Sequence, residues 1–139
     1  MVKSVITHTE SEVKMLQAYS LNVTVPSGSG VPFNNVTLEK GCTAKLQSVN
    51  TIELNKCGVY MIEVDGSSAT AASIQLFKDG VALPQAQSTG TSPNFTTLVQ
   101  VDRNNSCCAC DSPVTVQVKN VGTASATFTD INVVVTKVI

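Results

Sequence analysis

The chain has 139 residues, which fits one domain, and its formal net charge is −1 with 14% of residues charged. Because the basic residues are scattered, electrostatic capture of nucleic acid or of an anionic membrane is excluded as a basis for function. No run of ~18 apolar residues predicts a membrane span, and no secretory signal is visible in Met1–Tyr19. A surface covered mainly by Ser, Thr, Asn and Gln is typical of extracellular or virion proteins, and the abundance of Val and Thr favours strands.

Residues 1–20 mix charged and polar side chains, and we expect them to form an N-terminal arm or a short helix. The strand pattern begins at Leu21, so residues 21–139 are expected to form the domain itself. Farther along, Thr43–Ser48 and Thr51–Leu54 flank Val49-Asn50 and predict a β-hairpin.

The middle of the chain continues this alternation of strands and turns. Val59–Asp65 and Ser73–Lys78 are predicted strands, and Asp79-Gly80 after the second predicts another tight hairpin turn. Two polar segments, Gln85–Asn94 and Asp102–Pro113, are expected to be loops. Seven or more strands at spacings of ~8–12 residues indicate an all-β sandwich or barrel.

The last predicted strand, Ala126–Ile139, is apolar on both faces. Ile131, Val133 and Val135 share one face, whereas Val134 lies on the other. One face is expected to meet the core of the sandwich. The other face then needs a second sheet or a second subunit to cover it.

Five cysteines cannot all pair within one chain. Cys107, Cys108 and Cys110 form the most unusual local pattern, for which thiolate binding of a metal ion is one interpretation. The spacing does not match a standard zinc pattern, so disulfides or free thiols are the favoured interpretation.

Cys42 and Cys57 form a separate candidate pair. A two-residue turn at Val49-Asn50 pairs residues whose numbers sum to 99, and the numbers of these two cysteines do. They are then opposite each other, at ~4.5–5.5 Å between Cα atoms, where a disulfide is feasible. A slip of the register by one residue, or a turn that starts at Asn55, undoes this pairing.

Catalytic residues find little support in the sequence. The single histidine, His8, has polar neighbours and is interpreted as a surface residue. Glu63 and Asp65 lie on one face of a predicted strand, whereas a glycosidase needs carboxyl groups opposed across a cleft. No residue pattern indicates an enzyme, and no organic cofactor is implied.

Several segments, taken in order, resemble a known superfamily. The most specific pieces are an L-N-K-x-G-x-Y turn into a strand at Leu54–Tyr60 and an L-x-x-x-G-x-x-L-P pattern at Leu76–Pro84. The other segments are VPFNNV, VTVQVKNVG and INVVVTKVI, at Val31–Val36, Val114–Gly122 and Ile131–Ile139. Over about residues 21–139 the chain resembles the bacterial and phage branch of the complement-globular-head and tumour-necrosis-factor-like jelly rolls, including the C-terminal domain of spore-surface collagen-like glycoproteins and phage virion proteins.

The resemblance implies an all-β jelly-roll sandwich of about ten antiparallel strands that assembles as a homotrimer. It makes the strand with Ile131, Val133, Val134 and Val135 the strand at the trimer axis. The implied function is non-enzymatic display, adhesion or capsid decoration.

The chain departs from the spore-surface proteins because it lacks a Gly-X-Y collagen stalk. This favours a trimeric head-fibre or decoration protein of a phage or prophage virion, with capsid proteins as partners. The alternative is an adhesion module on a bacterial or spore surface that binds a host-surface glycan or protein through Gln85–Asn94 and Asp102–Pro113.

Overall fold

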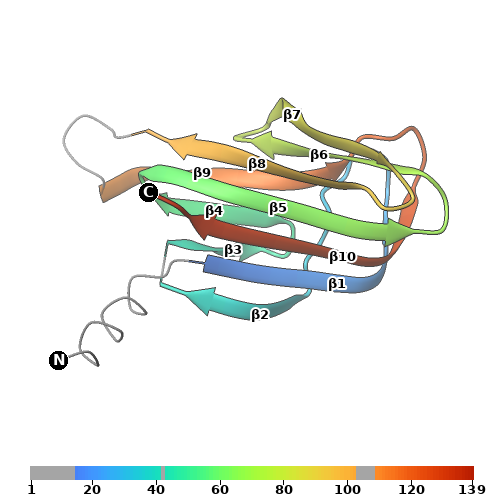
Figure 1. The fold of residues 1–139 in the computed structure, drawn as a ribbon, viewed down its shortest axis with the longest axis horizontal. Coiled ribbons are helices and arrows are strands. Elements are labelled where there is room, and N and C mark those ends of the chain that lie inside the picture. The colour runs from blue at the N-terminus through green and yellow to red at the C-terminus, as the bar shows by residue number, and fades with distance from the viewer. Residues whose placement is uncertain (1–14, 42, 103–108) are drawn as a thin grey trace.

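The computed structural model describes residues 15–41, 43–102 and 109–139, and it consists of two five-stranded sheets packed face to face (Figure 1). The strands are β1 (Met15–Val25), β2 (Asn35–Lys40), β3 (Ala44–Ser48), β4 (Thr51–Lys56), β5 (Gly58–Ser68), β6 (Ala72–Lys78), β7 (Val81–Gly90), β8 (Asn94–Val101), β9 (Ala109–Asn120) and β10 (Ala126–Lys137). The expected all-β jelly-roll sandwich is therefore confirmed.

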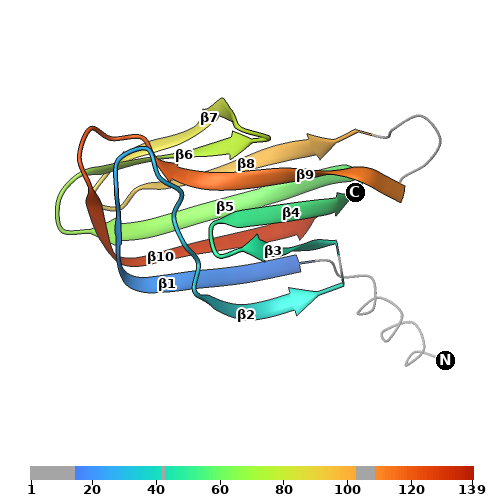
Figure 2. The same ribbon diagram turned by 180° about the vertical axis from the view of Figure 1, so that it is seen from behind.

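Each sheet is fully antiparallel and combines strands from distant parts of the chain. Sheet A has the order β2-β1-β10-β5-β8, and sheet B has the order β3-β4-β9-β6-β7. The last strand thus lies in the middle of sheet A, between β1 and β5, as both views of the ribbon show (Figure 2). The outward side chains of β10 therefore have those of β1 on one side and those of β5 on the other.

The core lies between the two sheets and follows a strict alternation of side chains. Along β5, Tyr60, Ile62 and Val64 point inward and are fully buried, while the residues between them point outward. Sheet B supplies the other half of the core, with residues such as Ile74 and Leu76. This period of two is what sets which side chains remain on the outside.

The structure corrects the expected domain boundary. β1 begins at Met15, so residues 15–20 belong to sheet A rather than to an arm. The sequence pattern is obscured by Ser20, a polar residue at a fully buried position. Its hydroxyl donates to the carbonyl of Pro32 at 2.6 Å and accepts from the backbone N–H of Asn34 at 2.8 Å, so the buried oxygen is satisfied.

Two expected hairpins are confirmed, and one expected loop is wrong. β3 and β4 flank the turn at Val49-Asn50, and β6 and β7 flank the turn at Asp79-Gly80. Gln85–Asn94, however, is mostly strand: β7 continues to Gly90, and β8 starts at Asn94. The segment is polar because β7 is an edge strand with most of its side chains in water.

The chain passes from sheet B to sheet A through a tight connection between β4 and β5. The buried Tyr60 hydroxyl donates to the carbonyl of Lys56 at 2.7 Å and accepts from the backbone N–H of the same residue at 3.2 Å. Gly58 has φ 143°, and a Cβ there would collide with the backbone carbonyl of Ile139. The L-N-K-x-G-x-Y pattern is therefore a structural device that fixes this connection.

We expect Tyr60→Phe to lower the free energy of unfolding by about 1–3 kcal/mol, because the Lys56 backbone groups lose their partner while the ring still fills its place. Urea denaturation measures the change. Tyr19→Phe is the matched control, since its side chain faces outward and should leave the midpoint almost unchanged. Equal midpoints for the two variants would contradict a stabilising role of the Tyr60 hydroxyl.

Candidate functional site

The outward face of sheet B is polar, and its side chains bind one another. The Gln117 amide donates to the Thr51 hydroxyl at 2.8 Å, and the Ser73 and Thr89 hydroxyls lie 2.8 Å apart. The Lys119 ammonium lies 4.7 Å from the centre of the Phe77 ring. Many hydrogen-bonding groups on this face are thus already satisfied within the protomer, so little is gained by covering it.

The outward face of sheet A, which we call the sheet A outer face, has a different character. Leu98 on β8 is 60% exposed and Leu21 on β1 is 58% exposed. Met61 on β5 lies opposite Leu98 and, on its other side, opposite Thr136. Apolar side chains from several strands therefore share this face, and no second sheet of the described chain covers it.

The structure divides the four residues expected at the trimer axis. Ile131, Val133 and Val135 are fully buried within the protomer's own core. They are unavailable to another subunit, which corrects their assignment to an intermolecular contact. Val134 alone points outward, between Gln17 of β1 and Glu63 of β5, and is half-buried.

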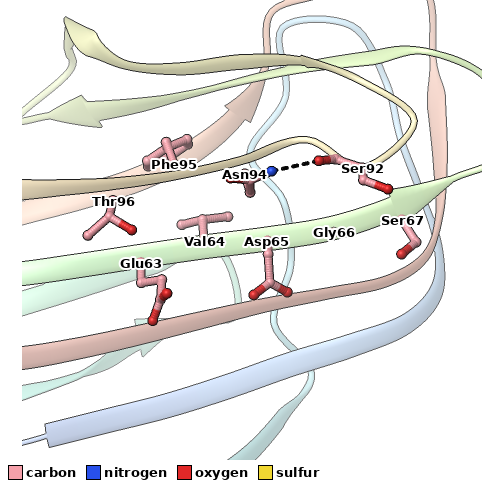
Figure 3. Close-up of a pocket in the computed structure, with 9 residues that line it drawn as sticks. All are labelled: Glu63, Val64, Asp65, Gly66, Ser67, Ser92, Asn94, Phe95 and Thr96. Atoms are coloured by element: carbon pink, nitrogen blue, oxygen red, sulfur yellow. Dashed lines mark hydrogen bonds between the residues drawn. The ribbon is translucent and has the colours of Figure 1, made fainter.

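A hollow of ≈ 220 Å³ lies along β5 and the start of β8 at the edge of this face (Figure 3). Glu63 and Asp65 extend from β5 toward the same side, as expected from their spacing. The Asn94 amide donates to the carbonyl of Ser92 at 2.9 Å. Since neither carboxylate faces another across a cleft in this hollow, the arrangement does not match a glycosidase.

A second hollow of ≈ 230 Å³ lies at one end of the sandwich and is lined mainly by small side chains around Asn120. Asn120 is almost completely buried, and its amide donates to the carbonyls of Val25 at 2.9 Å and Ala124 at 3.0 Å. Its oxygen accepts from the backbone N–H of Gly122 at 2.9 Å. These bonds use the Asn120 amide to tie the loop between β9 and β10 to the end of β1, so its role is structural.

Cys57 forms a disulfide bond. The side chains of the other four cysteines lie outside the described residues, so pairing with Cys42 stays a prediction. The register argument behind it needs correction: the sum of 99 holds only at Ser48↔Thr51, whereas Leu46↔Ile52 and the pairs beyond it sum to 98. A continued ladder would place Cys57 opposite Gly41, one residue from Cys42.

Cys107, Cys108 and the side chain of Cys110, the proposed metal ligands, lie outside the described part of the chain, as does His8. Within that part, no group of three potential metal-ligating side chains is present. The described ranges also contain no helix with the length and apolarity needed to cross a membrane.

The comparisons with known proteins rest on structure, because no protein-family model and no curated protein matches the sequence. The globular domain of zebrafish complement 1qA protein is similar with a TM-score of 0.67 at 10% identity, over 91% of this chain and 97% of that chain. Murine APRIL gives 0.65 at 10% identity, over 91% and 100% of the two chains. The fold is the complement- and tumour-necrosis-factor-like jelly roll. The vertex protein P5 of phage PRD1 shares this jelly roll, with a TM-score of 0.63 at 12% identity over 90% of this chain and 96% of that chain.

We expect Cys57→Ser to destabilise the protein by about 2–4 kcal/mol, because the unfolded chain loses a cross-link. If Cys42 is the partner, Cys42→Ser costs the same and the double variant costs no more than either. Thermal denaturation without reductant measures all three, and peptide mapping of the non-reduced protein identifies the bonded pair. Full stability of Cys42→Ser would exclude Cys42 as the partner.

Proposed function

We propose that the protein is a non-enzymatic, homotrimeric structural and display module, and that its place is a phage or prophage virion as a head-fibre or decoration protein. The observation that carries the proposal is the contrast between the two outward faces. Sheet B presents polar groups that bind one another, whereas sheet A presents Leu21, Met61, Leu98 and Val134 on a face that no other sheet of the described residues covers.

Removing such side chains from water is the main source of affinity between subunits. A stable interface buries about 800 Å² on each partner, an area that a five-stranded sheet face can supply. The resemblance noted from the sequence implies a trimer, and a closed ring of three needs each sheet A outer face to contact a different patch on its neighbour.

The virion assignment draws on the phage PRD1 vertex protein among the proteins of similar fold, together with a surface rich in neutral hydrogen-bonding groups. The alternative is an adhesion module on a bacterial or spore surface. The two segments expected to be its contact loops are partly strand, because β7 includes Gln85–Gly90 and β9 begins at Ala109. A glycan array with the purified oligomer separates adhesion from decoration.

We expect the purified chain to be a trimer at micromolar concentration. Leu98→Gln should weaken its association constant roughly tenfold or more, because a buried apolar contact is replaced by an amide without a partner. Val49→Gln is the control, since Val49 is also exposed but lies at the β3–β4 turn. Native mass spectrometry and sedimentation velocity give the stoichiometry; a clean monomer would contradict the proposal.

We also expect virus-like particles from the source organism, purified on a density gradient, to contain this chain as a trimeric component. Quantitative mass spectrometry of the particles measures its copy number relative to the capsid protein. A chain that is absent from the particles and present on the cell or spore surface would replace the virion role by the adhesion role.

A further inference from the structure

Sheet A ends on one side at β8, and this edge strand has a composition that favours pairing with another chain. Its segment Phe95–Val101 reads FTTLVQV, which is rich in β-branched and aromatic residues and contains no charge, Pro or Gly. Neutral segments of this length and composition are prone to add a further strand when they lie at an exposed edge. The edge of β8 therefore needs protection.

The other three edge strands carry protection in their own sequences. β2 includes Glu39 and Lys40, the short β3 includes Lys45, and β7 contains Pro84. Charged side chains and Pro at an edge oppose the addition of a strand, because the charge loses its hydration and Pro lacks a backbone donor. Of the four edge strands in the described ranges, β8 is the one with neither device.

The backbone groups of β8 that face away from β5 belong to alternate residues. The carbonyl of Pro93 accepts from the backbone N–H of Gly66 on β5 at 3.0 Å, so the odd-numbered positions that follow also bond to β5. A strand that paired with β8 would have to bond to the groups of the even-numbered positions. These are Asn94, Thr96, Leu98 and Gln100.

Side chains from sheet B occupy both ends of this row. The Lys78 ammonium on β6 donates to the carbonyl of Gln100 at 2.8 Å. At the other end, the Ser88 hydroxyl on β7 accepts from the backbone N–H of Asn94 at 3.0 Å. An incoming strand would have to displace both bonds before it could pair along the whole edge.

Lys78 is suited to this role by its position as well as by its charge. It lies two residues after the buried Leu76 and opposite the buried Val116, which is an inward-facing position of sheet B. An inward-pointing charge beside an edge blocks edge-to-edge pairing, because an added strand would bury it. The stretch between the two bonds, Thr96–Leu98, is shorter than the roughly five or six residues of a common strand.

We propose that Lys78 and Ser88 guard the free edge of β8 and prevent a second copy of the chain from pairing its own β8 with it. The partner is a second copy because β8 is neutral along its length, so two copies can pair about a two-fold axis without charge repulsion. The inference goes beyond the proposed function. It concerns the backbone edge of β8 rather than the side chains of the sheet A outer face, and it applies to a monomer and to a trimer alike.

The test compares K78M/S88A with the wild-type chain by sedimentation velocity at micromolar concentration. Both guarding bonds are exposed to solvent, so their loss should leave the urea midpoint almost unchanged. We expect the variant to form species of roughly twofold or greater mass than the wild-type particle, because the free edge can then pair. Amide hydrogen exchange of the peptide that spans β8 should be slower in these species, since its outward N–H groups become bonded.

Three further variants separate edge pairing from a general loss of charge. T96K in the K78M/S88A background should restore the wild-type distribution, because Thr96 is exposed in the middle of the edge and a Lys there opposes pairing. V49K in the same background restores the charge at the β3–β4 turn and should not restore the distribution. K119M alone removes the same charge from the central strand β9 and should sediment like the wild type.

Each outcome decides the matter. A K78M/S88A chain that keeps its urea midpoint and sediments like the wild type would overturn the inference, as would larger species that V49K suppresses as fully as T96K. If the double variant unfolds in markedly less urea, S88A alone decides: it should form the same species in smaller amount, and their absence would overturn the inference. A wild-type monomer would contradict the proposed function only, since the unguarded variant would then form dimers.

Discussion

The period of two along the central strands of sheet A determines most of what this protein presents to its surroundings. Tyr60, Ile62 and Val64 of β5 must point inward to fill the sandwich, and their burial is complete. Met61 and Glu63 therefore point outward, because successive side chains alternate between the two faces of a strand. A slip of one residue would place a carboxylate in the core, so the register is strongly fixed. The composition of the outer face is thus a direct consequence of core packing.

Much of this architecture can be predicted from the sequence, because hairpin turns and alternating valines are local signals. The sequence-based predictions fail where the polarity of the residues does not match their position in the fold. Ser20 is buried although it is polar, since its hydroxyl bonds to the Pro32 and Asn34 backbone from a distant segment. β7 looks like a loop because, as an edge strand, it keeps polar side chains on most of its positions. Both depend on contacts that a single segment does not contain.

The candidate site shows the same limit. An apolar strand with two hydrophobic faces correctly indicates Val134 as an outward residue, but it does not separate Val134 from its buried neighbours. The patch that includes Met61 and Leu98 emerges only when the order β10-β5-β8 is known, because 37 positions separate these two residues in the chain and they meet across a ladder. Strand order is a non-local property, and sequence periodicity carries no information about it.

The L-N-K-x-G-x-Y pattern, one of the pieces by which the sequence resembles this fold, lies at the start of β5. This is where the alternation of inward and outward side chains along β5 is set. Tyr60 holds both backbone groups of Lys56, and Gly58 accepts the close approach of the C-terminal backbone. This connection decides that position 60 enters sheet A facing inward, and so it decides indirectly that positions 61, 63 and 65 face outward. The residues by which the sequence resembles the fold therefore include inward positions of β5, whereas the residues that can contact a partner are the outward positions that alternate with them. Proteins only 10–12% identical to this chain share its fold, and a shared fold does not imply a shared function.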